Sequence, residues 1–216
     1  DKIKSGQLAP FEWERLMSRI EILRNAPIYI DDTPSLSVFE LRTKARRLVR
    51  EHGIKIIIID YLQLMNASGM SFGSREQEVS TISRSLKQLA KELQIPIIAL
   101  SQLNRSVESR GNDKDGKEGK RPQLSDLRES GAIEQDADMV CFIHRPEYYT
   151  RSKEDANGNS IEGLAEFIIA KHRSGATDTV NMKFVSYLAR FQNYDEDTRL
   201  TDFSAPVTSK FNTPDT

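Results

Sequence analysis

Two polar segments follow apolar runs in this sequence, and both carry side chains that suit phosphate chemistry. Asp60 comes directly after the isoleucines at 56–59, and Ser101 and Gln102 come directly after the run at 97–100. In open parallel sheets, ligands bind beyond the carboxyl ends of the strands. The Asp60 carboxylate could hold Mg²⁺ through water, and the Gln102 amide could hydrogen-bond a phosphate or an attacking water. The residues alone also allow a simpler interpretation, in which both side chains bond nearby backbone.

A basic pair lies beside a predicted turn. Lys171 and Arg173 are two positions apart and precede Ser174 and Gly175. On a strand, residues at that spacing project from the same face, so both could reach one anion. A guanidinium entering a neighbouring subunit's site would stabilise charge on a transferred phosphoryl group. A solvated basic hairpin is the alternative.

The segment at 121–138 has the composition of a phosphate-gripping loop, because it combines Arg128, several hydroxyl side chains and Gly131. Guanidinium donors and exposed backbone amides contact a nucleic-acid strand without reading its sequence. The same text could begin a capped helix at Ser130, and the two interpretations are compatible.

No phosphate-binding loop is present in the sequence. Gly111, Gly116 and Lys117 have the required spacing, but Glu118 stands where Ser or Thr is needed and no apolar strand precedes them. The mechanism needs a strand, a tight turn and a helix N-terminus, so we reject this match. The histidines have no metal-ligand spacing either.

These residues require a scaffold of helices and strands. Apolar residues recur at three- and four-residue steps in three segments, which predicts helices over 10–25, 37–53 and 79–93. The isoleucines at 56–59 lack polar alternation, so we expect both faces of that strand to be buried, as in a parallel sheet. Further strands are predicted at 28–30, 97–100 and 138–143, with a hairpin formed by 164–170 and 179–184. The predicted fold is α/β, with a mainly parallel sheet flanked by helices and an antiparallel hairpin annex.

Composition narrows the function classes. The net charge of −1 gives no general attraction to nucleic acid, so binding must come from local clusters. The longest apolar run, 56–59, is far short of the roughly 20 residues that cross a bilayer. One cysteine fits a reducing, cytoplasmic location. We expect a loop at 111–119 and a flexible tail at 195–216, with residues 1–194 forming the folded part.

Taken together, the text resembles the bacterial replicative DNA helicases of the DnaB type, which are hexameric ring ATPases with a RecA-like motor domain. The resemblance covers most of the chain and is carried by the segments 45–53, 59–65, 82–87, 99–105 and 125–138. It implies a P-loop NTPase fold whose first strand, phosphate-binding loop and catalytic glutamate lie upstream of Asp1.

The resemblance also assigns roles. Asp60 resembles the Walker B carboxylate that organises Mg²⁺, and Gln102 resembles the sensor that links the state of ATP to the DNA loops. Lys171 and Arg173 look like the pair, including the arginine finger, that is supplied in trans to the adjacent subunit's ATP. Three further residues match the loop that follows single-stranded DNA, namely Arg128, Glu129 and Gly131.

The expected function is therefore ATP-driven movement along single-stranded DNA by a homo-hexamer that unwinds duplex DNA, with primase and a helicase loader as primosome partners and no membrane. Because the phosphate-binding loop is absent, we expect this 216-residue chain alone to lack ATPase activity. The alternative is a non-catalytic RecA-like module for DNA binding or assembly. A filament-forming recombinase of the same fold is disfavoured by the 125–138 segment.

Overall fold

The chain forms two compact units in the computed structural model. Unit 1 comprises Asp1–Arg105 and Leu124–Ala137, and unit 2 comprises Ser106–Gln123 and Asp138–Thr216. Within the described part of the chain, no helix is long and apolar enough to cross a membrane. The predicted loop at 111–119 and the tail at 195–216 lie outside the described residues. The structure describes residues 2–67, 69, 71–110, 120–149, 154 and 160–194.

Helix α3 (Val38–His52) begins and ends where its sequence predicts. The Ser37 hydroxyl accepts a hydrogen bond from the Glu40 amide at 3.2 Å, and the Glu40 carboxylate accepts one from the Ser37 amide at 3.0 Å. This reciprocal pair satisfies two amide donors that the first turn of a helix would leave unpaired. Gly53 ends the helix with a φ of 62°, a left-handed conformation that glycine adopts readily.

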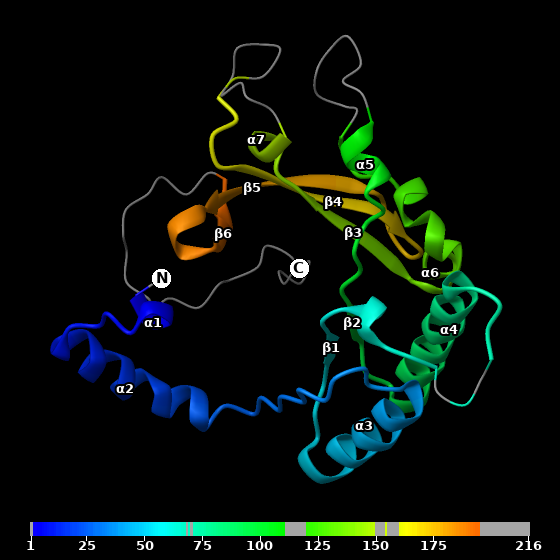
Figure 1. Cartoon of the computed structure of the whole chain (residues 1–216), viewed down its shortest axis with the longest axis horizontal. Helices are drawn as coiled ribbons and strands as arrows, with labels where there is room; N and C mark the ends of the chain where they lie inside the picture. Colours follow the sequence, from blue (N-terminus) through cyan, green and yellow to red (C-terminus); the bar gives the residue numbers. More distant parts are fainter. Residues whose placement is uncertain are drawn as a thin grey trace, which may run out of the picture. The chain divides into compact units, whose positions relative to one another are not determined.

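Helix α4 (Arg75–Leu93) is the central packing element of unit 1. It contacts α3, the strand β2 (Ile97–Ala99) and helix α6 (Gly131–Asp136), and Figure 1 shows α3 and α6 on different sides of it. Its predicted apolar stripe is confirmed, because Val79, Ile82, Leu86 and Leu89 are all buried. The core of unit 1 consists of Val38, Leu41, Ala45, Leu62, Met65, Ala67, Val79, Ile82, Leu86 and Leu89.

The predicted parallel pairing is present between β1 (Ile57–Ile59) and β2, with Ile59 opposite Ala99. The expectation that both faces of β1 are buried is wrong. Ile57 and Ile59 pack against the core of unit 1, but the side chain of Ile58 is 63% exposed. Alternating side chains of a strand point to opposite faces, and the described elements cover one face of this two-stranded sheet.

The N-terminal segment departs further from prediction. Helix α2 (Pro10–Arg24) matches the predicted helix, but none of its residues is buried, and Trp13 is 54% exposed. The predicted strand at Ile28 to Ile30 is wrong, because this segment is not in a strand. Isoleucine favours extended backbone, yet a strand also needs a partner with which to form hydrogen bonds.

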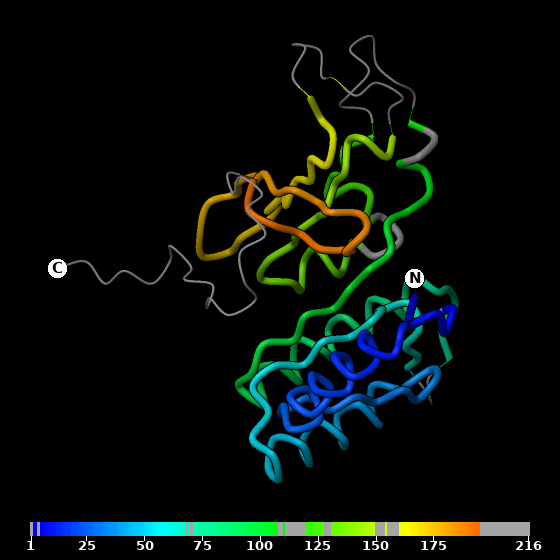
Figure 2. The backbone as a smooth tube through the Cα atoms, turned by 90° about the vertical axis from the view of Figure 1, so that its left-hand side faces the viewer, coloured from blue at the N-terminus to red at the C-terminus, as the bar shows by residue number. Residues whose placement is uncertain are grey.

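Unit 2 is built on an antiparallel sheet in the order β3-β4-β5-β6. The predicted hairpin is confirmed as β4 (Leu164–His172) and β5 (Asp178–Val185), and the predicted strand at 138–143 is β3 (Met139–His144). The sheet is larger than a hairpin annex because β3 joins one edge and β6 (Arg190–Asn193), which was not predicted, joins the other. Figure 2 shows the turn from β5 to β6 as an orange loop.

Strand β3 alternates buried and exposed side chains. Val140, Phe142 and His144 are buried, whereas Met139 and Ile143 are 46% and 56% exposed. An antiparallel sheet can leave one face in water, so this strand is buried on one face only.

The remaining elements are α1 (Lys2–Ser5), η1 (Leu62–Leu64), α5 (Ser106–Ser109), η2 (Leu124–Ser130), α7 (Pro146–Tyr149) and η3 (Ser186–Leu188).

Candidate functional site

The parallel pairing of β1 with β2 places Asp60 and Gln102 at the same edge of the sheet. The Leu100 amide donates to the Ile59 carbonyl at 2.9 Å, and the Leu62 amide donates to the Leu100 carbonyl at 2.8 Å. These bonds continue the pairing past the last residues of the strands. Asp60 therefore lies between two backbone positions, Ile59 and Leu62, that are both hydrogen-bonded to Leu100. Both Asp60 and Gln102 are exposed to solvent, as a ligand-binding edge requires.

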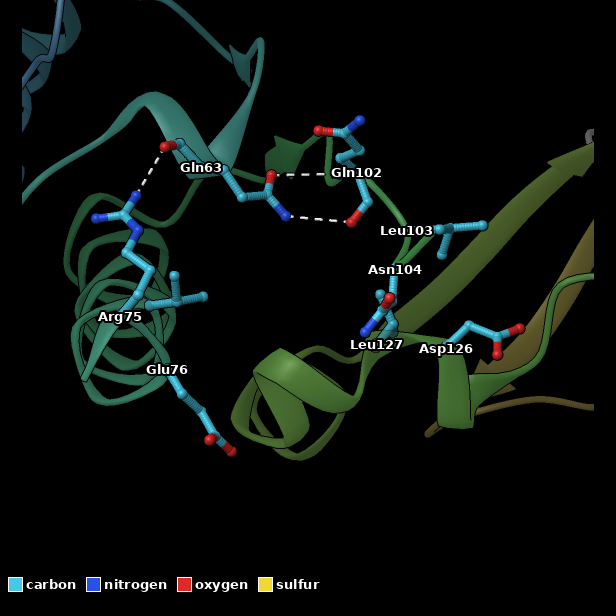
Figure 3. A pocket seen from close by; sticks show the side chains of 9 residues that line it. Gln63, Arg75, Glu76, Gln102, Leu103, Asn104, Asp126 and Leu127 are labelled. Carbon is cyan, nitrogen blue, oxygen red and sulfur yellow. Dashed lines mark hydrogen bonds between the residues drawn. The ribbon is translucent and has the colours of Figure 1, made fainter. Parts of the chain in front are cut away.

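A side chain that the sequence analysis did not single out joins these two segments. Gln63 donates from Nε2 to the Ser101 hydroxyl at 2.9 Å and to the Gln102 carbonyl at 3.2 Å. Its Oε1 accepts from the Gln102 amide at 3.2 Å. Figure 3 shows this two-way contact and the side-chain amide of Gln102 extending away from it. The contact therefore fixes the backbone of Gln102 and leaves its side chain exposed.

Arg75, at the start of α4, supports the backbone of this segment. Its Nη2 donates to the Gln63 carbonyl at 2.7 Å and to the Met65 carbonyl at 3.0 Å, while Nη1 pairs with Glu78. The pKa of the Glu78 carboxyl is lowered, chiefly by a hydrogen bond from the Ala67 amide and also by the pairing with Arg75. The Glu78 carboxylate is therefore ionised at neutral pH, which keeps the pairing with Arg75 intact.

A cavity of about 370 Å³ opens beside Gln63 and Gln102, and Asp126 also lines it (Figure 3). The Asn104 amide donates to the Asp126 carbonyl at 3.2 Å, and Asp126 is itself 5% exposed. This bond connects the segment after β2 to η2, the element that contains Arg128 and Glu129. The strand-end residues and the predicted DNA loop are thus neighbours within unit 1.

The predicted DNA-contacting residues occupy a short helical stretch. Arg128 and Glu129 lie in η2, and Gly131 begins α6, which agrees with the alternative that Ser130 leads into a helix. The side chains of Arg128 and Glu129 lie outside what the structure describes. A Cβ atom at Gly131 would meet nothing within 4 Å, so local packing does not require glycine there.

In unit 2, Lys171 lies in β4 and Arg173 directly follows the last residue of that strand. Lys171 pairs with Val140 in the sheet register, and the Arg173 amide donates to the Asp138 carbonyl at 2.9 Å. The Arg173 guanidinium also lies 3.7 Å from the Asp138 carboxylate, with 48% of its side chain exposed. An exposed ion pair at that separation is worth at most about 1 kcal/mol.

Close packing defines the turn after this pair. A Cβ atom at Gly175 would overlap the ring of His172, which lies between the two basic residues. Any larger residue at this position would therefore require the His172 side chain to shift. The spacing of the basic pair could be predicted from the sequence, but this contact could not.

The donor set at the sheet edge fits Mg²⁺. Among the described residues no group of three or more His, Cys, Asp and Glu side chains gathers as a metal cluster. A single exposed carboxylate at Asp60 suits an ion that keeps several waters and is held by one or two carboxylates together with phosphate oxygens.

The carboxylate and the amide thus lie at the carboxyl ends of two parallel strands, the edge at which open α/β sheets bind ligands. A family model described as the DnaB-like helicase C terminal domain matches residues 1–193 of the chain. This chain belongs to that family. The predicted mixed α/β fold, with parallel and antiparallel sheets, is confirmed by similar solved structures.

Similar proteins agree with this membership. The chain is 50% identical over 191 residues to replicative DNA helicase DnaB of Geobacillus stearothermophilus, covering 88% of this chain and 39% of that protein. It is 47% identical over 204 residues to replicative DNA helicase DnaC of Bacillus subtilis, covering 94% of this chain and 42% of that protein. The chain thus spans about two fifths of the length of these curated relatives.

Two solved structures share the fold. A protein described as an ATPase domain superposes with a TM-score of 0.77 at 40% identity, covering 89% of this chain and 64% of that one. A DnaB-like replicative helicase, described together with its interactions with primase, superposes with a TM-score of 0.75 at 41% identity, covering 89% of this chain and 43% of that one.

Proposed function

We propose that this chain is the C-terminal part of a replicative helicase motor, which couples ATP hydrolysis to movement along single-stranded DNA and so unwinds the duplex. The observation that carries the proposal is the parallel pairing of β1 and β2, which brings Asp60 and Gln102 to one edge of the sheet. The family membership of residues 1–193 supports it.

Within this function Asp60 would hold Mg²⁺ through water, because Mg²⁺ keeps part of its hydration shell and prefers carboxylate and phosphate oxygens. The chemistry that the ion would supply there is neutralisation of charge on the phosphate oxygens. Gln102 contacts the terminal phosphate or the attacking water through its amide, which has no pKa to change during the reaction. Asp60 and Gln102 thus form one side of the ATP site.

Lys171 and Arg173 form the other side of the ATP site, in the neighbouring subunit of a homo-hexameric ring. The 48% exposure of the Arg173 side chain supports this role, because the guanidinium must reach a phosphate outside its own subunit. A hydrolysis site shared between subunits makes turnover depend on assembly, which allows hydrolysis to proceed around the ring.

Arg128, Glu129 and Gly131 contact single-stranded DNA in this proposal. A loop that grips the backbone rather than base edges permits movement over any sequence. Primase and a helicase loader are the expected partners, and the solved DnaB-like helicase described with primase supports the first of them.

The alternative is a non-catalytic module that binds DNA or assists assembly. It is favoured by one observation, because the 216 residues contain no acceptable phosphate-binding loop. Both proposals expect the isolated chain to lack measurable ATPase activity, whereas only the motor function expects the full-length protein to have it.

The deciding experiment measures Mg²⁺-dependent ATP hydrolysis and unwinding of a forked duplex by the full-length protein. We expect both activities in the wild type, and a loss of at least about 100-fold in hydrolysis for Asp60→Asn, because the Mg²⁺ ligand is lost. Asp32→Asn makes the same chemical change at an exposed position of unit 1 and should stay within about twofold of the wild type. A full-length protein that binds single-stranded DNA but hydrolyses no ATP would establish the alternative.

A further inference from the structure

The side chain of Gln63 extends the parallel sheet beyond the point where its main-chain pairing ends. The last main-chain bond between the two segments runs from the Leu62 amide to the Leu100 carbonyl at 2.8 Å. Beyond it, the amide group of Gln63 accepts from the Gln102 amide at 3.2 Å and donates to the Gln102 carbonyl at 3.2 Å. One side chain therefore does what a neighbouring strand would do for Gln102.

Few side chains can make this contact. The amide of glutamine both donates and accepts, whereas a carboxylate only accepts and a thioether offers a weak acceptor alone. The additional bond from Gln63 Nε2 to the Ser101 hydroxyl at 2.9 Å uses the second proton of the same group. All three contacts depend on one amide group of defined orientation.

The backbone of Gln63 is also held by hydrogen bonds. Arg75 donates to the Gln63 carbonyl at 2.7 Å and, with Glu78, ties it to the first turn of α4. Gln63 itself is partly buried. The side chain that contacts Gln102 is therefore held at its backbone by α4.

The other side of Gln102 leads to the predicted DNA loop. Two residues further on, the Asn104 amide donates to the Asp126 carbonyl at 3.2 Å, inside η2. The Gln63–Gln102 contact and the Asn104–Asp126 bond, joined by the intervening backbone, thus connect the Asp60 segment to η2.

We infer that Gln63 is a positioning residue that couples the ATP site to the DNA loop, by moving the backbone of Gln102 together with the Asp60 segment. The inference rests on the proposed function and deepens it, since it names the side chain through which the two sites communicate. Coupling of this kind is a free energy shared by two ligands, so it is measured as the effect of one ligand on the affinity for the other.

The test measures the affinity of the full-length protein for a fluorescent oligo-dT, once in the presence of a non-hydrolysable ATP analogue and once in the presence of ADP. The measured quantity is the ratio of the two dissociation constants. We expect Gln63→Met to bring this ratio at least fivefold closer to one than in the wild type, with the affinity for the ATP analogue within about threefold. A merely structural role would lower both affinities for DNA and leave the ratio unchanged.

Gln88→Met is the matched control. It makes the same substitution at an exposed position of α4, away from the Gln102 segment, and should keep the wild-type ratio. Thermal melting of all variants checks the fold. If Gln63→Met does not fold, Gln63→Glu replaces it, because the carboxylate keeps the length of the side chain but cannot donate to the Gln102 carbonyl.

Ser101→Ala supplies a second, milder variant. It removes one of the three contacts of Gln63, so we expect the ratio to move towards one by less than in Gln63→Met. Combining the two substitutions should move it no further than Gln63→Met does. A ratio closer to one in the double variant than in Gln63→Met, or a wild-type ratio in Gln63→Met, would overturn the inference while leaving the proposed function intact. A wild-type protein whose affinity for DNA does not respond to nucleotide would overturn the proposed function itself.

Discussion

The two units of the chain present their functional residues in opposite ways. In unit 1, Asp60 and Gln102 are far apart in sequence, and the parallel pairing of β1 with β2 brings them together. In unit 2, Lys171 and Arg173 are near neighbours in sequence at the end of one strand, and the Arg173 side chain is 48% exposed. Unit 1 thus brings its two residues together by its own topology, whereas unit 2 exposes Arg173 beside a partly buried Lys171.

The largest expected effect tests the outward display in unit 2. Arg173→Ala in the full-length protein should lower ATP turnover about 1,000-fold and leave the affinity for nucleotide within about threefold, since an arginine finger stabilises charge that develops during transfer. Steady-state hydrolysis and equilibrium binding of a fluorescent nucleotide measure the two quantities. Arg190→Ala, an exposed arginine on β6 of the same sheet, is the control and should change neither.

Oligomers that mix two variants test whether Arg173 acts on the site of a neighbouring subunit. Subunits with Asp60→Asn and subunits with Arg173→Ala each damage a different side of the shared site, so mixing them should restore part of the activity. If the mixture is no more active than either variant alone, Arg173 does not act in trans.

The next effect concerns the packing of unit 1. Ile82 is completely buried, whereas Ile58 is 63% exposed. Ile82→Ala should lower the free energy of unfolding by about 3 kcal/mol, because it removes buried methyl groups and leaves a cavity. Ile58→Ala should cost less than about 1 kcal/mol. Urea unfolding followed by circular dichroism measures both, and equal losses would mean that Ile58 is covered in solution.

The smallest effect concerns a buried histidine of unit 2. Burial lowers the pKa of the His144 imidazole, the carboxylate of Glu166 opposes that shift, and the Arg121 guanidinium adds to it. Arg121 itself donates to Glu166 at 3.1 Å, and the ring of His144 stacks on Tyr149 with 5.6 Å between the ring centroids.

The sign of the pH dependence follows from that lowered pKa. Between the folded and unfolded pKa values the unfolded chain binds the proton that folded His144 resists, so stability falls as the pH drops below about 6.5. In His144→Gln the fall in Tm between pH 7.5 and pH 5.5 should be smaller than in the wild type, by a few degrees. His52→Gln, at an exposed position of unit 1, should reproduce the wild-type profile.

Local patterns predicted much of the fold. The capping residues Ser37 and Glu40 and the terminal Gly53 define α3, and the spacing of the apolar residues on α4 predicted its buried stripe. Predictions that needed a distant partner were less accurate. Ile28 to Ile30 is not a strand, and Ile58 is exposed, because strand formation and burial depend on what packs against a segment.

The residues of the candidate site likewise fall into two groups, those that the sequence predicted and those that only the structure revealed. The sequence predicted that Asp60 and Gln102 follow strands, and the structure shows that those strands are paired. Gln63 and Arg75 carried no signal that could be recognised, since an isolated glutamine and an arginine at the start of a helix are ordinary surface residues in sequence. Their importance lies in bonds to residues 101–102 and to the carbonyls of 63 and 65, respectively.

The sequence by itself determined both ends of α3, the C-terminal end of α4, the presence of strands before Asp60 and Gln102, and the family, because caps, periodicity and motifs are made by residues that are close along the chain. Only the tertiary structure decided the register of β1 against β2, the two-way contact of Gln63 with Gln102 and the place of β6 in the sheet. Those features depend on contacts between residues far apart in sequence, whose geometry is set by the packing of the whole unit and not by any local preference.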